Sequence, residues 1–313
     1  MPTPEEIRQN KEDSKRMLAE MTAGVTDVAT GEVKGKILLF GVKGTGKSVL
    51  AAAIAKALVK GTGKKVLYVD TSDGWVSLRN HPSILKDQDF KKIPFESFKH
   101  LHVLAKAIRA NIAPFDNVGA VIFDELSKMA MFERIEIVQK NHPTYSTPEW
   151  PDYNELGNNA QLLLKRFFTI PGLHIVAIAH ERDKVIPSKP PVRVWDATPD
   201  FNPAVSKVVC EDMHLVARIT AEEKKDLSNP GVPSYVRTAQ VHPTFRIDTK
   251  SRIGGLNIKV STIDLLKRIE AWVGEGMPEE DIKPPVIVPE EIPVAEAEAE
   301  AELTEIDEAD WVE

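Results

Sequence analysis

The residues from Gly41 to Ser48 constrain this chain more than any other part of its sequence. They read Gly-Val-Lys-Gly-Thr-Gly-Lys-Ser and match G-x-x-x-x-G-K-[ST], the pattern of a phosphate-binding loop. Such a loop works between a strand and a helix. The apolar run Lys36–Phe40 predicts the strand, and residues Ser48–Lys60 predict the helix. The sequence therefore favours an α/β nucleotide-binding fold.

Each part of this loop has an expected role. Glycines let backbone N–H groups turn toward phosphate oxygens, and the helix N-terminus adds a favourable dipole. We expect Lys47 to reach the β- and γ-phosphates of ATP, and Ser48 to bind Mg²⁺. The expected binding set for ATP is Gly41, Val42, Lys43, Gly44, Thr45, Gly46, Lys47, Ser48 and Val49.

Further apolar and amphipathic segments alternate along the chain. Strands are predicted at Lys65–Asp70, Gly119–Asp124, Leu173–Ala179, Asp212–Thr220 and Tyr235–Asp248. Helices are predicted at His100–Asn111, Asn154–Thr169 and Thr262–Val273, with a Pro-rich stretch from Ile186 to Pro203. This order indicates a mostly parallel central sheet flanked by helices.

Charge divides the 313 residues unevenly. Residues 275–313 hold 15 Asp and Glu and one Lys, a net charge of −14, whereas the rest holds 39 Lys and Arg against 32 Asp and Glu. We expect a polar N-terminal segment at 1–32 with a helix over Pro4–Met21, an ATPase core at 33–274 and a disordered acidic tail at 275–313. A basic body with an acidic tail is typical of proteins that handle nucleic acid, but also fits a solubilising tail.

Other features exclude whole classes of protein. The single cysteine, Cys210, forbids an internal disulfide, and the polar start lacks the apolar stretch of a secretory signal. No apolar run approaches the ~18–20 residues of a membrane helix. We therefore expect no membrane partner and a cytoplasmic protein, in the host cytoplasm if a phage encodes it.

Carboxylates at strand ends are candidates for the metal and the chemistry. The run Val121-Ile-Phe-Asp124-Glu125 predicts a buried strand that delivers Asp124 to Mg²⁺, with Glu125 positioned to polarise the attacking water. Asp70 and Asp73, at the end of another strand, are rivals for the role of general base. His180 ends a further strand and is expected to contact the γ-phosphate or the water; a satisfied core histidine is the alternative.

In the order of these motifs the chain resembles the RecA-like P-loop ATPases, which include RecA, RadA-type recombinases and DnaB-type helicases. The match runs over residues 33–260 through GVKGTGKS, VLYVD, VIFDE and IVAIAH to Thr249-Lys250-Ser-Arg252-Ile-Gly254. The resemblance implies that Lys250 and Arg252 act as fingers on a neighbouring subunit's nucleotide. An exposed basic turn is the alternative.

Within that family the chain looks most similar to phage-encoded ATPases of single-strand annealing and recombination. Trp150-Pro-Asp-Tyr153-Asn154 and His180-Glu181 carry this likeness. One departure is that RecA has its catalytic Glu two residues beyond the Asp of the second strand, where this chain has Ser72; this favours Glu125. The GTG of the loop also resembles AAA+ proteins, but those continue into a helical lid, whereas this chain continues into strands.

Two stretches, 139–153 and 182–207, are candidate DNA loops, because the family places its DNA-binding loops there. Their candidate contacts are Trp150, Lys184, Lys189, Arg193 and Trp195. Subunit packing or a lid is the alternative for each.

The resemblance implies an ATP-hydrolysing, single-stranded-DNA-binding ATPase that forms a homo-oligomeric ring or filament beside a single-stranded-DNA-binding protein. The alternatives are a replicative helicase or helicase loader, and a nucleotide-gated regulatory module with little turnover.

Overall fold

The computed structural model describes residue 12 and residues 34–86, 89–144, 147–186, 192–224, 234–243, 249–253 and 256–274. The helix expected at Pro4–Met21, apart from residue 12, the acidic tail and Lys189 lie outside the described residues. The helical segments are α2 (Lys47–Leu58), η1 (Gly74–Asn80), α3 (Pro82–Leu85), α4 (Phe98–Arg109), α5 (Leu126–Asn141), α6 (Trp150–Phe168), α7 (Pro203–Asp212) and α8 (Thr262–Gly274).

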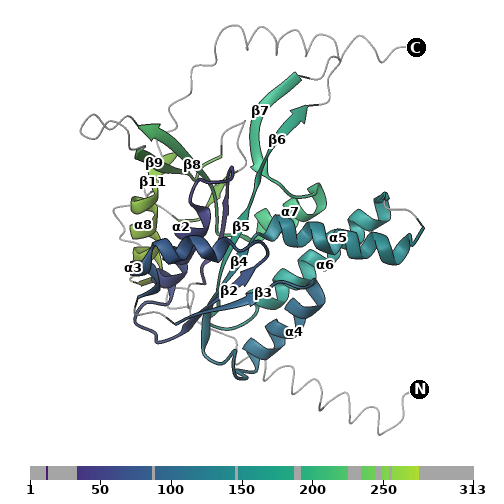
Figure 1. Ribbon diagram of the computed structural model, residues 1–313, viewed down its shortest axis with the longest axis horizontal. Coiled ribbons are helices and arrows are strands. Elements are labelled where there is room, and N and C mark those ends of the chain that lie inside the picture. Colours follow the sequence, from purple (N-terminus) through teal and green to yellow (C-terminus); the bar gives the residue numbers. More distant parts are fainter. Residues whose placement is uncertain are drawn as a thin grey trace.

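The strands are β1 (Lys36–Phe40), β2 (Lys65–Asp70), β3 (Phe90–Pro94), β4 (Val118–Asp124), β5 (His174–Ala179), β6 (Glu181–Ile186), β7 (Val192–Pro199), β8 (Leu215–Lys224), β9 (Ser234–Gln240), β10 (Lys250–Ser251) and β11 (Lys259–Ser261). One sheet has the order β11-β9-β8-β1-β5-β4-β2-β3, and β10 also pairs with β8. From β8 to β3 all neighbours are parallel, whereas β9, β10 and β11 join antiparallel. The predicted mostly parallel sheet is confirmed (Figure 1).

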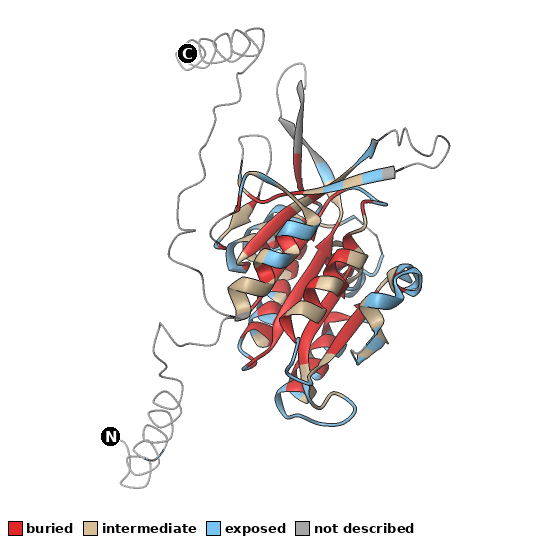
Figure 2. Cartoon of the chain, turned by 90° about the vertical axis from the view of Figure 1, so that its left-hand side faces the viewer, coloured by how far each residue is buried: buried red, intermediate tan, exposed pale blue. Residues whose placement is uncertain are grey.

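Helices cover both faces of this sheet, so its central strands are apolar throughout. In β1, Leu38 and Phe40 pack in the core that contains α4, α5, α6 and α7. Ile37 and Leu39 point the other way, into the core that contains α2 and α8. Figure 2 shows the resulting block of buried strands in the middle of the molecule. A parallel sheet with both faces covered explains why KILLF and its neighbours lack polar alternation.

The structure corrects the sequence prediction in several segments. Phe90–Pro94 forms an edge strand, β3, whose largely exposed FKKIP sequence gives no strand signal. Leu126–Asn141 is the helix α5, which the sequence analysis did not predict. The Pro-rich stretch is a separate hairpin, β6–β7, followed by α7. Pro199 ends β7 and Pro203 begins α7, two positions where proline needs no backbone donor.

No helix in the described part of the chain combines the length and the apolar character needed to span a membrane.

A substitution of Phe167 on α6 tests the packing of the core that contains α4, α5, α6 and α7. It is fully buried and meets Phe123 of β4 edge to face, with ring centroids 5.1 Å apart. We expect Phe167→Ala to lower the free energy of unfolding by about 3–5 kcal/mol, measured by urea denaturation. Leu162→Ala on the same helix is the control: Leu162 is 47% exposed, so its change should stay within about 0.5 kcal/mol. Equal effects of the two substitutions would contradict this packing.

Candidate functional site

The strand register gathers the chemically important residues at one edge of the sheet. Phe40 of β1 lies opposite Ala179 of β5, and Asp124 of β4 lies opposite Asp70 of β2 and Ile178 of β5. Because these strands are parallel, the segments that follow them emerge together. The carboxyl edge of an open α/β sheet is where such folds bind ligands.

The loop after β1 wraps around the amine of Lys47. Lys47 Nζ donates to the carbonyl oxygens of Gly41 and Val42, at 2.8 Å each. Burial lowers the pKa of Lys47, and the carboxylates of Glu125 and Asp124 oppose that shift. The amine is thus held at the N-terminus of α2, where the loop's backbone N–H groups favour an anion.

Two glycines of the phosphate loop lie close to neighbouring strands. A Cβ on Gly41 would meet the carbonyl oxygen of Ile219 in β8. A Cβ on Gly46 would lie 2.8 Å from Nε of Arg237 in β9, and Gly46 has a φ of 88°. The backbone conformation favours glycine at position 46, and the Arg237 side chain lies directly beside it.

Asp124 is the centre of a buried hydrogen-bond cluster. Ser48 Oγ donates to Asp124 Oδ2 at 3.0 Å, and the Tyr68 hydroxyl donates to the same oxygen. Burial raises the pKa of Asp124, whereas these two hydrogen bonds act to lower it. A hydroxyl and a carboxylate are hard oxygen ligands of the kind Mg²⁺ takes beside substrate phosphates, so Ser48 and Asp124 fit that ion.

Tyr68 was missed by the sequence analysis. It lies in β2, is 2% exposed, and its pKa is raised by burial and by Asp124. The available signal was a tyrosine inside the apolar run KVLYVD, since a buried tyrosine hydroxyl needs a polar partner. Which partner it takes depends on the β2–β4 pairing.

Asp70 and Asp73, the alternative candidates for the general base, differ in burial and in their hydrogen-bond partners. Asp70 is buried, accepts hydrogen bonds from the backbone N–H groups of Ser72 and Gly74, and forms an ion pair with Lys92 at 3.2 Å. It therefore holds the turn after β2. Asp73 is 80% exposed and lines the cleft described below.

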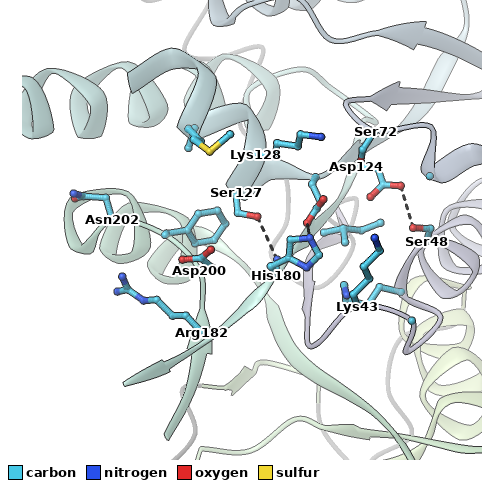
Figure 3. A pocket seen from close by; sticks show the side chains of 18 of the residues that line it. Lys43, Ser48, Ser72, Asp124, Ser127, Lys128, His180, Arg182, Asp200 and Asn202 are labelled. Atoms are coloured by element: carbon cyan, nitrogen blue, oxygen red, sulfur yellow. Dashed lines mark hydrogen bonds and ion pairs between the residues drawn. The ribbon is translucent and has the colours of Figure 1, made fainter. Parts of the chain in front are cut away.

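Glu125 and His180 lie against each other between the loop and α5. His180 Nε2 lies in contact with Glu125 Oε1, and the His180 backbone N–H donates to Ser127 Oγ at 3.2 Å (Figure 3). Burial and Asp124 raise the pKa of Glu125; burial and Lys47 lower that of His180. The Glu125 N–H donates to Thr71 Oγ1 at 2.9 Å, so its backbone is fixed from β2.

One cleft of about 970 Å³ is lined by Lys47, Ser48, Asp124, Glu125 and His180. Beyond Glu125 it extends along α5, α6 and α7. Lining side chains there include Lys128, Arg134, Tyr153, Arg182 and Asn202, several of which Figure 3 shows around His180. Three cationic side chains, those of Lys128, Arg134 and Arg182, therefore border the cleft beyond Glu125.

Lys250 and Arg252 lie away from the phosphate loop of their own chain. Lys250 Nζ donates to the carbonyl oxygens of Cys210 and Glu211 at the end of α7, at 3.2 and 2.6 Å. β10 pairs with the first residues of β8, toward the edge opposite the loop, and Arg252 follows it with an exposed side chain. They are not part of their own chain's phosphate site.

The residues proposed for DNA contact do not lie in irregular loops. Trp150 is the first residue of α6 and is 76% exposed. That helix begins there because the Glu149 N–H donates to Asp152 Oδ2 at 2.8 Å, a reciprocal capping arrangement. Lys184 belongs to β6, and Arg193 and Trp195 to β7.

Three comparisons with known proteins gave different results. Among curated proteins, no sequence matches this chain. A solved structure of a KaiC-like protein from the hyperthermophilic archaeon Pyrococcus horikoshii OT3 is similar at 15% identity and a TM-score of 0.38, covering 67% of this chain and 80% of that one. The family model AAA_24, described as an AAA domain, matches residues 34–253. Since that match spans well over half of the sequence, the chain belongs to this AAA domain family of P-loop ATPases.

Proposed function

We propose that this protein is a RecA-like ATPase that binds single-stranded DNA and hydrolyses ATP between the subunits of a ring or filament, in annealing or recombination. The observation that carries the proposal is the contact between Glu125 and His180. It joins the candidate water-activating carboxylate to the residue from which the β6–β7 hairpin rises.

The geometry supports a simple hydrolysis mechanism. Lys47 and the loop N–H groups bind the β- and γ-phosphates. Bound Mg²⁺, held by Ser48 and Asp124, would neutralise phosphate charge. Glu125 accepts a proton from water, whose oxygen bonds to the γ-phosphorus as the bond to the β–γ bridging oxygen breaks and ADP leaves.

The hairpin is the proposed link to DNA. Its first residue, Glu181, directly follows His180, and the Asp200 N–H, just after β7, donates to the His180 carbonyl at 2.8 Å. Both ends of the hairpin therefore meet at His180. A change at the γ-phosphate would reach the strands that carry Lys184, Arg193 and Trp195, side chains of the types that track phosphates and stack on bases.

Oligomeric action is supported by the place of Lys250 and Arg252. Both lie away from their own phosphate loop. In a head-to-tail assembly each chain would offer this segment to a neighbour's nucleotide.

ATP turnover with and without a single-stranded oligonucleotide tests the function. We expect DNA to raise turnover several-fold, because both ends of the hairpin are joined to His180, which contacts Glu125. Lys47→Ala should abolish turnover in both conditions. Turnover that is unaffected by DNA would contradict the DNA-binding role and favour a regulatory module. Turnover that survives Lys47→Ala would exclude the loop at 41–48 as the phosphate site.

Glu125 should be the general base. Glu125→Gln is expected to keep ATP binding and lower kcat by ~10²–10⁴-fold, because an amide cannot accept the proton. Asp73→Asn is the matched control, since Asp73 lies in the same cleft but is 80% exposed. Single-turnover hydrolysis measures both; a large loss in Asp73→Asn with little in Glu125→Gln would reverse the assignment.

Mixed assemblies test the neighbour's role of Arg252. Arg252→Ala and Lys47→Ala should each be inactive alone. Mixed in equal amounts they should recover part of the turnover, because some interfaces then combine an intact loop with an intact Arg252. Co-assembly is verified by light scattering, and verified co-assembly without recovery would exclude a finger supplied in trans.

A further inference from the structure

The β8–β9 pair, which the hydrolysis mechanism does not use, lies directly against the phosphate loop. Gly41 at the start of the loop approaches the backbone of Ile219 in β8, and Gly46 at its end approaches the side chain of Arg237 in β9. The loop therefore touches this antiparallel pair at both ends. The Arg237 side chain, which lies close to Gly46, is therefore beside the N-terminus of α2.

The strand register independently places Arg237 there. In β9, Ala239 is fully buried in the core that contains α2. Arg237 lies two residues away and so faces the same side of the sheet. It pairs with Ala221, three residues beyond Arg218, which lies opposite Phe40, the last residue of β1. Arg237 thus stands past the edge of the sheet, level with the loop.

The electrostatics of this position point to an anion. No carboxylate among the described residues forms an ion pair with Arg237, whereas Arg218 on the neighbouring strand is bound by Glu181 at 2.6 and 2.9 Å. The N-terminus of a helix carries a partial positive charge, so a guanidinium beside it is unfavourable by itself. An anion bound between the two would remove that conflict, and phosphate matches the planar fork of arginine.

Tyr235 extends the same face outward. It lies two residues before Arg237 on β9, one strand repeat farther from the sheet edge, and is 48% exposed. An exposed aromatic ring two residues from Arg237 offers a flat surface on which a base or ribose can pack.

We propose that β9 completes the nucleotide site of its own chain, with Arg237 bound to the nucleotide phosphates and Tyr235 packed against the nucleoside. This inference rests on the proposed ATP site at the loop. It adds a binding surface to that site that the loop motif and the strand-end carboxylates do not include.

Calorimetric titration with Mg²⁺–ATP, Mg²⁺–ADP and tripolyphosphate tests the inference. Arg237→Ala should weaken binding of all three by about 10- to 100-fold, the loss expected for hydrogen bonds between charged groups. Arg237→Lys should lie between, since it keeps the charge without the fork. Tyr235→Ala should weaken ATP and ADP but leave tripolyphosphate unchanged, and Tyr235→Phe should bind all three as the unmodified protein does.

The control is Lys259→Ala, which removes an exposed positive charge from β11, the strand that pairs with β9. An equal loss in that control would show a general charge effect and overturn the inference. Unaltered binding by Arg237→Ala, in a protein where Lys47→Ala abolishes binding, would overturn it as well while leaving the proposed function intact. If the unmodified protein binds none of the three ligands, the proposed function fails first. The melting temperature without ligand should be unchanged in Arg237→Ala, since this exposed side chain has no ion-pair partner among the described residues.

Discussion

The buried carboxylate of Asp124 holds together the parts of this site that come from different strands. It receives hydrogen bonds from Ser48 at the start of α2 and from Tyr68 in β2. It also excludes any side chain at position 74, where a Cβ would meet Asp124 Oδ2. One acidic group thus fixes the phosphate loop, two neighbouring strand ends and the turn after β2. Since a buried carboxylate is costly unless it is hydrogen-bonded, these contacts are as much a condition of folding as of metal binding.

Much of this arrangement follows from local sequence. Lys36–Phe40 and Lys65–Asp70 were predicted with the bounds they have in the structure, because their unbroken apolar runs end in a glycine or an aspartate. Segments without such runs were missed. β3 is largely exposed, and the strands of the hairpin form a two-stranded sheet separate from the main one, so neither gives the unbroken apolar run of a central strand. Contacts set by register, such as Tyr68 with Asp124 and Arg237 with Gly46, join residues far apart in the chain, so spacing alone does not reveal them.

The family match bears on the comparison with AAA+ proteins made from the sequence. The AAA+ proteins were set aside because the sequence continues into strands after β5, and the structure has β8 and β9 there. The matching family is nonetheless described as an AAA domain. The strands after the hairpin are therefore a feature within this family match, and they place Arg237 and Ile219 beside the loop.

The closed base of the β6–β7 hairpin also has a mechanical consequence. Its strands begin after His180 and end before Asp200, whose N–H donates to the His180 carbonyl, so a backbone hydrogen bond closes the base of the hairpin outside the main sheet. Six residues of strand make an arm of about 20 Å. The whole length of this arm is joined to the rest of the chain at His180, the residue that contacts Glu125.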